Sequence, residues 1–359
     1  MPVIPCLVYA GLIVLASAAS LHPYNVDPDT VSISGFSSGG FMAAQLGIAY
    51  SDTFKLGFGV FAGGPYDCAR NQPNASCMFN NTPSITTPTA NLISWSGREI
   101  DDIANLKDRR IYIQTGILDD TVGPNVVAQL RSQLSSFVTR SHTKYIDTPD
   151  AGHTFPTDFD GPGNVPCNIS LKPYISNCGY DGAGAALQWI YGYLNPRNTG
   201  TLAGQIISFD QQADYGAIGM GDTAYLYVPA ACEDGTTPCK LHIALHGCFQ
   251  SYGLIQDKFV QNTGYNQWAD TNNIIIVYPQ TTVDNSVHTI WDGVEHSNPY
   301  ACWDWIGLYG DNVDQKGGVQ MQAIVNQVKQ ITSGHPQSYK VAPFGHDDPF
   351  SFSVLTSSD

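Results

Sequence analysis

Residues 31–47, VSISGFSSGGFMAAQLG, decide the fold of this chain, because a β-branched strand passes there directly into an Ala-rich helix. The junction, Gly35-Phe36-Ser37-Ser38-Gly39, has the G-x-S-x-G pattern of a nucleophile elbow. Its glycines permit a sharp turn, which lifts the Ser37 hydroxyl to the head of a sheet. An ordinary Gly-Ser turn is the alternative, and Ser38 is the competing hydroxyl. We expect Ser37 to be the nucleophile and the backbone N–H of Ser38 to bind the oxyanion.

A serine hydroxyl at its ordinary pKa is a poor nucleophile, so Ser37 needs a base that is oriented by an acid. In α/β-hydrolases the three residues follow in the order Ser, Asp, His. Here the strand of residues 109–116 is followed by Asp119, and the strand and loop of residues 143–156 carry His153. The candidate triad thus occupies three successive strand ends in the expected order.

Two other residues compete for these roles. Asp120 adjoins Asp119 and is the rival for the acid. An aspartate in such a D-D turn is usually structural, so the pattern favours Asp119 without excluding Asp120. His142 is the weaker candidate for the base because it precedes its strand, whereas His153 follows one.

Strands and helices alternate along the chain. The expected strands are short β-rich runs at residues 31–34, 58–61, 110–114, 144–147, 224–228, 241–245 and 274–278. The expected helices lie at residues 41–50, 125–138, 184–194 and 317–331. This alternation predicts an α/β fold with a mostly parallel central sheet. No repeat or long low-complexity linker interrupts residues 21–334, so we expect a single catalytic domain there.

The order of these segments departs from that of an ordinary α/β-hydrolase. In that fold an apolar strand ending in His-Gly precedes the nucleophile and supplies the second oxyanion donor. Here such a segment, residues 241–248, follows Ser37, and residues 274–279 resemble the next strand of the same sheet. We therefore expect a circularly permuted α/β-hydrolase fold. A second, independent domain beginning near residue 205 is the alternative.

Composition indicates an extracellular protein. Charged residues make up 13% of the 359 residues, against about 25% in an average globular protein, and the net charge is −15. Such a surface repels phosphate backbones and anionic lipid, so we expect neither nucleic acid nor a membrane as partner.

Residues 1–20 resemble a signal peptide, with a membrane anchor as the alternative. Residues 335–359 lose periodicity and form a C-terminal tail of unknown role.

The cysteines support the same compartment. Removal of Cys6 with the leader leaves eight, an even number that suits disulfides. Three close couples and the two remaining cysteines give the expected bridges Cys68–Cys77, Cys167–Cys178, Cys232–Cys239 and Cys248–Cys302. Zinc is the rival reading, but no C-x-x-C pair occurs, so we expect no metal. Glycosylation sequons stand at Asn74, Asn80 and Asn168.

Seven segments together closely resemble the fungal extracellular poly(3-hydroxybutyrate) depolymerases: SGFSSGGFMAAQLG, GVFAGGPYDCAR, DDTVGPNVVAQL, AGHTFPTDF, LHIALHGCFQSY, NTGYNQWADTNN and CWDWIGLYG. The resemblance runs from about residue 21 to residue 334, and the tail after Gly334 has no counterpart. It implies a secreted, single-domain enzyme with a circularly permuted α/β-hydrolase fold.

The resemblance also implies roles for particular residues. Ser37 would be the nucleophile, His153 the base and Asp119 the acid. The backbone N–H groups of Ser38 and Cys248 would form the oxyanion hole, and Trp305 would line the substrate crevice.

We therefore expect a secreted serine hydrolase that cleaves ester bonds of poly(3-hydroxybutyrate), or of a related aliphatic polyester, through an acyl-enzyme. It would act without a cofactor, as a monomer, on solid or oligomeric polyester. An esterase of feruloyl or acetyl-xylan type, acting on plant cell-wall esters, would use the same triad. A non-catalytic protein that binds a surface or a carbohydrate is the alternative from another class, because residue order does not establish geometry.

Overall fold

The computed structural model describes residues 19–336. The expected signal peptide and C-terminal tail lie outside the described residues, apart from Ala19, Ser20, His335 and Pro336. Both remain predictions. Within the described part, no helix combines the length and apolarity needed to cross a bilayer.

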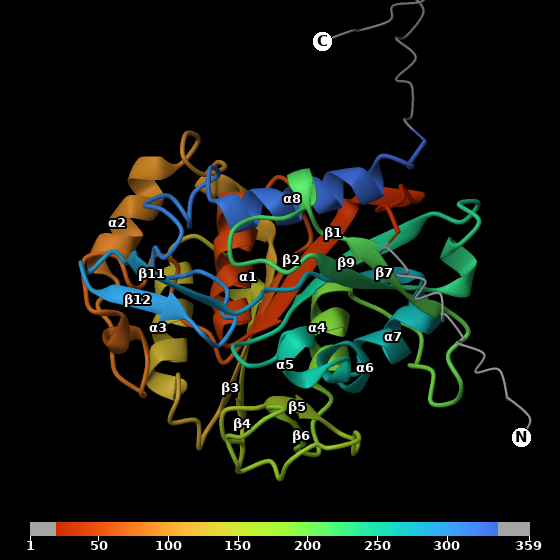
Figure 1. The fold of residues 1–359 in the computed structure, drawn as a ribbon, viewed down its shortest axis with the longest axis horizontal. Helices are drawn as coiled ribbons and strands as arrows, with labels where there is room; N and C mark the ends of the chain where they lie inside the picture. Colours follow the sequence, from red (N-terminus) through yellow and green to blue (C-terminus); the bar gives the residue numbers. More distant parts are fainter. Residues whose placement is uncertain (1–18, 337–359) are drawn as a thin grey trace, which may run out of the picture.

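An eight-stranded sheet runs through the centre of the molecule (Figure 1), in the order β4-β3-β2-β1-β9-β10-β8-β7. The strands are β1 (Val26–Phe36), β2 (Gly57–Phe61), β3 (Arg110–Gly116), β4 (Thr143–Thr148), β7 (Gln205–Asp210), β8 (Thr223–Val228), β9 (Cys239–Leu245) and β10 (Ile274–Tyr278). From β4 to β10 all neighbours are parallel, whereas β8 and β7 continue the sheet antiparallel at one edge. The predicted mostly parallel sheet is confirmed.

Helices cover both faces of this sheet (Figure 1), which is why strands such as β2 and β10 are buried along their whole length. All five residues of β10, IIIVY, are buried. One face carries α1 (Ser38–Ala49), α3 (Pro124–Leu134) and α8 (Val319–Thr332). The other face carries α4 (Gly182–Tyr191), α5 (Tyr252–Ile255), α6 (Lys258–Asn262) and α7 (Tyr265–Asn272). Each layer of helices therefore encloses its own hydrophobic core.

The chain order is that of a circular permutation. β1 pairs with β9, so that Ile33 stands opposite Ile243, and β9 pairs with β10. The strands around Leu241 and Ile274 thus belong to the same sheet as the strand that precedes Ser37, as predicted. A separate second domain from residue 205 is excluded, because both halves of the chain contribute strands to one sheet.

Several elements were not expected from the sequence. They are β7 at the sheet edge, α2 (Thr86–Trp95), α5, α6, α7 and two small pairs, β5 (Phe155–Thr157) with β6 (Ile175–Asn177) and β11 (Asp284–Thr289) with β12 (Glu295–Asn298). Their sequences are short or polar; β12, for example, is EHSN. Such segments contain too few apolar residues for a hydrophobic period to be recognised.

Four disulfides join the cysteine couples that the sequence indicated: Cys68–Cys77, Cys167–Cys178, Cys232–Cys239 and Cys248–Cys302. Three close short loops. The fourth spans 54 residues and links the loop after β9 to the loop after β12.

Candidate active site

Ser37 occupies the turn between β1 and α1, with φ 55° and ψ −122°. This left-handed region is sparsely populated by residues other than glycine, and it is typical of a strained nucleophile elbow. A Cβ on Gly35 would lie 2.0 Å from the carbonyl oxygen of Gly39, and a Cβ on Gly39 would lie 2.4 Å from that of His246. Both glycines of the G-x-S-x-G pattern are therefore sterically required, because α1 begins in direct contact with β1 and the end of β9.

The structure brings Ser37, His153 and Asp119 into one hydrogen-bonded relay. His153 Nε2 lies 2.9 Å from Ser37 Oγ, and His153 Nδ1 lies 2.9 Å from Asp119 Oδ2. All three side chains are buried. With Asp119 accepting from Nδ1–H, the imidazole presents an unprotonated Nε2 to the serine hydroxyl, which is the geometry of nucleophilic catalysis.

The Asp119 carboxylate is held by its backbone surroundings. Burial alone raises the pKa of Asp119, but the adjacent His153 and the N–H groups of Val122 and Thr121 outweigh it, so its pKa lies below the usual value. Asp119 Oδ1 accepts from the Thr121 N–H at 2.9 Å and from the Val122 N–H at 3.0 Å. Oδ2 is left to face the imidazole as part of an ionised carboxylate.

The rival residues lie elsewhere. Asp120 is exposed and makes no side-chain hydrogen bond to another described residue. His142 lies in the turn before β4, at the opposite end of that strand from His153. One detail of the expectation is wrong, because β2 lies between β1 and β3 and contributes no member of the relay. The three residues follow three strands of one sheet, but these strands are not consecutive.

Two backbone N–H groups beside Ser37 have no protein acceptor within residues 19–336, namely those of Ser38 and Cys248. Ser38 opens α1, where the first N–H groups of a helix have no partner in the helix itself. Cys248 comes to the site because β9 ends beside β1; a Cβ on Gly247 would lie 2.9 Å from Ser37 Cβ. The Ser38 hydroxyl instead accepts from the Trp303 N–H at 3.3 Å.

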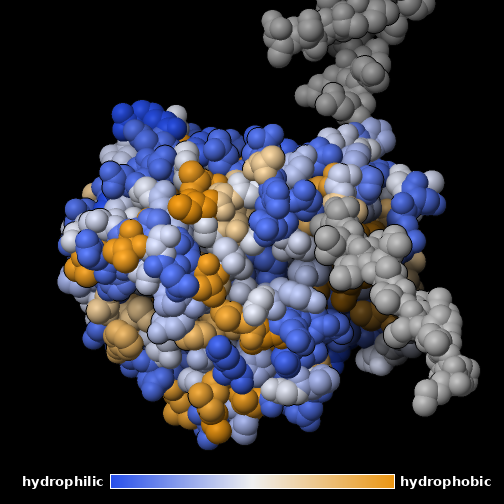
Figure 2. Space-filling model, viewed as in Figure 1, coloured by the Kyte–Doolittle hydropathy of each residue, from blue (hydrophilic) through white to orange (hydrophobic). Residues whose placement is uncertain are grey.

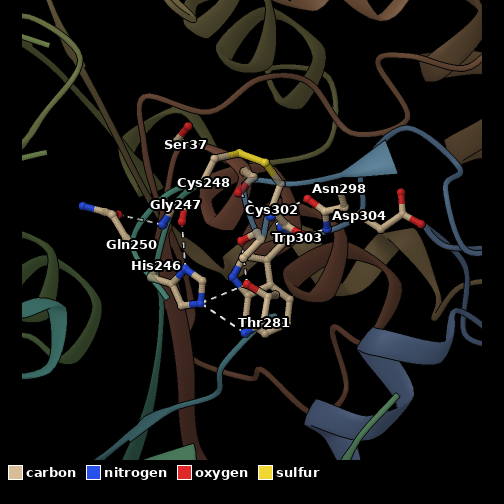
Figure 3. Close-up of a disulfide and its surroundings, with 12 residues drawn as sticks. Ser37, His246, Gly247, Cys248, Gln250, Thr281, Asn298, Cys302, Trp303 and Asp304 are labelled. Carbon is tan, nitrogen blue, oxygen red and sulfur yellow. Dashed lines mark hydrogen bonds between the residues drawn. A yellow bond between two sulfur atoms is a disulfide. The ribbon is translucent and has the colours of Figure 1, made fainter. Parts of the chain in front are cut away.

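A cavity of about 340 Å³ opens at Ser37 and His153. Trp305 lines it and stacks on Phe41 with ring centroids 4.1 Å apart. The Cys248–Cys302 disulfide links the loop of Gly247 and Cys248 to the segment that carries Trp303 (Figure 3). Most of the exposed wall is apolar, so the site suits an uncharged substrate.

Several lining residues were missed from the sequence: Phe41, Met78, Val122, Tyr174, Phe249, His296, Tyr300 and Leu308. Apart from Phe41 in α1 and His296 in β12, they come from loops, and these loops are far apart in the chain. Only Phe41 carried a usable signal, since it lies four residues after Ser37 and therefore one helical turn further along α1.

The segment that carries Trp305 is organised by a buried carboxylate. Asp304 accepts backbone hydrogen bonds from Ile306, Gly307, Leu308 and Tyr309 at 2.7–3.1 Å. Burial raises the pKa of Asp304 despite these donors. The loop thereby holds one conformation around the crevice wall.

The sequons differ in accessibility. Asn168 is exposed, and Asn80 is exposed but accepts from the Asn125 N–H at 2.8 Å through its Oδ1. Asn74 is half-buried and lines the cavity. No group of three or more metal-binding side chains is found in the part of the chain that the structure describes.

Comparison with known proteins shows what this chain is similar to. The model of the prolyl oligopeptidase family matches residues 12–162. A polyhydroxybutyrate depolymerase of Talaromyces funiculosus is 63% identical over 318 residues, which cover 89% of this chain and 94% of the relative. A poly(3-hydroxybutyrate) depolymerase of Delftia acidovorans is 42% identical over 326 residues, covering 89% of this chain and 63% of the relative.

Solved structures agree with these relatives. The crystal structure of the PHB depolymerase from Penicillium funiculosum matches with a TM-score of 0.88 and 62% identity, covering 89% of this chain and all of that one. A second structure, of a PHB depolymerase with a serine-to-alanine substitution in complex with an R3HB trimer, matches equally well.

Proposed function

Because this chain belongs to the polyhydroxybutyrate depolymerase family, we propose that it is a serine hydrolase that cleaves the ester bonds of poly(3-hydroxybutyrate). The observation that carries the proposal is the relay of Ser37, His153 and Asp119 at the opening of an apolar cavity. Two uncommitted N–H donors flank the serine, so nucleophile, base and anion-binding groups converge on one point.

Acylation follows from this geometry. Ser37 Oγ attacks the carbonyl carbon of the ester while His153 Nε2 accepts the hydroxyl proton. Negative charge develops on the carbonyl oxygen, where the N–H groups of Ser38 and Cys248 stabilise it. When the tetrahedral intermediate collapses, the ester C–O bond breaks and the leaving alkoxide takes the proton from His153. The acyl group stays on Ser37.

Deacylation repeats the sequence with water. His153 removes a proton from a water molecule, which attacks the acyl carbon, and the proton then returns to Ser37 Oγ. The products are two shorter chains, one ending in a carboxylate and one in a hydroxyl group. No cofactor takes part in these steps.

The substrate assignment rests on the chemistry of the crevice and on the relatives. A 3-hydroxybutyrate chain is uncharged and carries small methyl groups, which suits a cavity walled by Trp305 and Phe41. Polymer adsorption would use the surface of the same domain, where apolar side chains lie among hydrophilic ones (Figure 2). Tyr300 is exposed and lines the cavity, and three further exposed apolar side chains lie close in sequence to lining residues: Phe79, Leu118 and Leu171.

Secretion and a monomeric state complete the proposal. The leader-like residues 1–20, the low share of charged residues and the four disulfides suit an oxidising, extracellular compartment.

Two substrates test the proposed function directly. The purified protein is incubated with a poly(3-hydroxybutyrate) film and, separately, with feruloylated xylan, and released acids are separated by chromatography. We expect 3-hydroxybutyrate and its oligomers from the film. Ser37→Ala should abolish release, whereas Ser38→Ala, its matched neighbour, should keep most of it because its N–H remains. Ferulate release without polymer hydrolysis, or an active Ser37→Ala variant, would contradict the proposal.

A further inference from the structure

We propose that His246, a buried histidine outside the catalytic relay, is a positioning residue that aims the Cys248 N–H at the oxyanion. The inference rests on the proposed function, because it assigns a role in forming that function's oxyanion hole. His246 directly precedes Gly247 and Cys248 in the chain, and its side chain is fully buried.

The hydrogen-bond partners of His246 determine its tautomer. Nδ1 lies 2.7 Å from the carbonyl oxygen of Gly247, which can only accept, so Nδ1 carries the proton. Nε2 lies 3.2 Å from the backbone nitrogen of Thr281, which can only donate, so Nε2 is unprotonated. The Thr281 hydroxyl oxygen also lies 3.2 Å from Nε2, but its proton is donated to the Ala301 carbonyl at 2.6 Å. The Thr281 backbone N–H therefore remains the donor to Nε2. Burial lowers the pKa of His246 to about 4, which agrees with a neutral ring.

The direction of the Cys248 N–H follows from the bond to Gly247. In a trans peptide the C=O and the N–H point in opposite directions. The Gly247 carbonyl points to His246, so the Cys248 N–H of the same peptide unit points away from His246. Figure 3 shows Ser37 and His246 on opposite sides of Gly247. The imidazole, together with the Gln250 N–H that donates to the same carbonyl at 3.2 Å, therefore sets the orientation of the oxyanion donor without touching the reacting atoms.

A second side chain, that of Gln250, holds the N–H group of Gly247. The Gly247 N–H donates to Gln250 Oε1 at 2.7 Å (Figure 3), and Gln250 Nε2 donates to the Pro173 and Tyr174 carbonyls at 2.8 and 3.1 Å. Gln250 is fully buried. Because glycine is conformationally free, a peptide here could take alternative orientations, and it is held by these two side chains, by the Gln250 N–H on the Gly247 carbonyl and by the disulfide at Cys248.

Two nearly isosteric variants separate positioning from packing. In His246→Asn the amide nitrogen occupies the place of Nδ1 and can still donate to Gly247, whereas in His246→Gln the amide lies at the place of Nε2 and cannot. We measure kcat and KM on p-nitrophenyl butyrate and the unfolding midpoint of each variant. We expect His246→Gln to lose about 10- to 100-fold in kcat at unchanged KM, because an oxyanion donor acts on the transition state. His246→Asn should retain kcat within about threefold, by keeping the donor to Gly247.

His242 is the matched control, since it is equally buried in β9 but forms hydrogen bonds with Ser32 and Ser34 and not with Gly247 or Cys248. His242→Gln should lower the unfolding midpoint while leaving kcat of the folded protein unchanged. Equal kcat for the two His246 variants, or a change in KM alone, would overturn the positioning role.

Two further arms keep the test decisive. If His246→Gln does not fold, His246→Leu fills the same buried site without a donor to the Gly247 carbonyl and should give the same loss of kcat at unchanged KM; a parent-like kcat would overturn the proposal. Ser37→Ala run in parallel separates this inference from the proposed function. An inactive parent contradicts the function itself, whereas an active parent with unaffected His246 variants contradicts only the positioning role.

Discussion

Replacement of Asp119 by Asn changes one atom of the relay, and the structure predicts which way the new amide will face. The N–H groups of Thr121 and Val122 both point at Oδ1 and can only donate. The amide oxygen of Asn will therefore take the Oδ1 position, and the NH₂ group will face His153 Nδ1. Nδ1 must then accept, which moves the imidazole proton to Nε2.

An imidazole protonated at Nε2 cannot accept the proton of Ser37. The same replacement in a serine protease triad lowers kcat about 10⁴-fold, which corresponds to about 5 kcal/mol of transition-state free energy. We expect a loss of this order in Asp119→Asn, measured as kcat on p-nitrophenyl butyrate at neutral pH. KM should change little, because Asp119 is buried and does not line the cavity.

Asp120→Asn is the matched control, because it makes the same chemical change one residue away at an exposed position. It should keep kcat within about twofold of the parent, since surface substitutions rarely matter. A loss below about tenfold in Asp119→Asn, or equal losses in both variants, would refute the tautomer argument.

The folding cost of Asp119→Asn has a defined pH window. The folded pKa of Asp119 lies below its unfolded value, so its contribution to stability is present above the unfolded pKa, about 3.9, and is lost as the pH falls through the folded pKa. The difference in unfolding free energy between parent and variant should therefore shrink on acidification. A difference that is constant with pH would contradict this.

Three other perturbations test separate parts of the structure. Trp305→Ala should reduce hydrolysis of polymer and oligomers more than that of a nitrophenyl ester, because a crevice wall binds only a longer substrate; parallel losses would make Trp305 structural. Replacing Cys248 and Cys302 by Ser opens a 54-residue loop, which should cost about 4 kcal/mol in the chain-entropy model and lower turnover of the folded enzyme; full activity would identify a purely structural bridge. His242 is buried with its pKa lowered to about 3, so the unfolded chain binds a proton there from about pH 6.5 downward while the folded chain does not. Its contribution to stability is therefore full above that pH and falls on acidification, and His242→Gln should flatten the pH dependence of unfolding free energy by about 1.4 kcal/mol per unit between about pH 6 and pH 4; an unchanged slope would disprove it.

Where a local steric rule applied, the sequence alone was sufficient. The elbow at Ser37 needs a strand, a helix and two glycines within a few residues, and the contacts of Gly35 and Gly39 show why no other residue fits. Short β-rich runs predicted the elbow strand and six of the other seven strands of the main sheet, and only the edge strand β7 was missed. Cysteine spacing indicated the four bridges.

Other features depended on tertiary contacts between distant segments. Asp119 and Asp120 are adjacent and chemically identical, and only burial beside His153 and the N–H groups of the following turn distinguish them. The cavity wall is likewise assembled mostly from loops that no periodicity connects.

The segment of Gly247 and Cys248, which carries the proposed oxyanion donor, shows the physical reason most directly. Ser32 and His242, 210 residues apart, meet because β1 and β9 pair in parallel, and the same pairing carries Gly247 and Cys248 to Ser37. A pattern of side chains can predict that a strand ends in His-Gly, since this depends on neighbours in the chain. Which nucleophile that strand will serve depends on which strands pair, and the direction of the Cys248 N–H depends on His246 and Gln250 holding one peptide, so only the assembled sheet decides both.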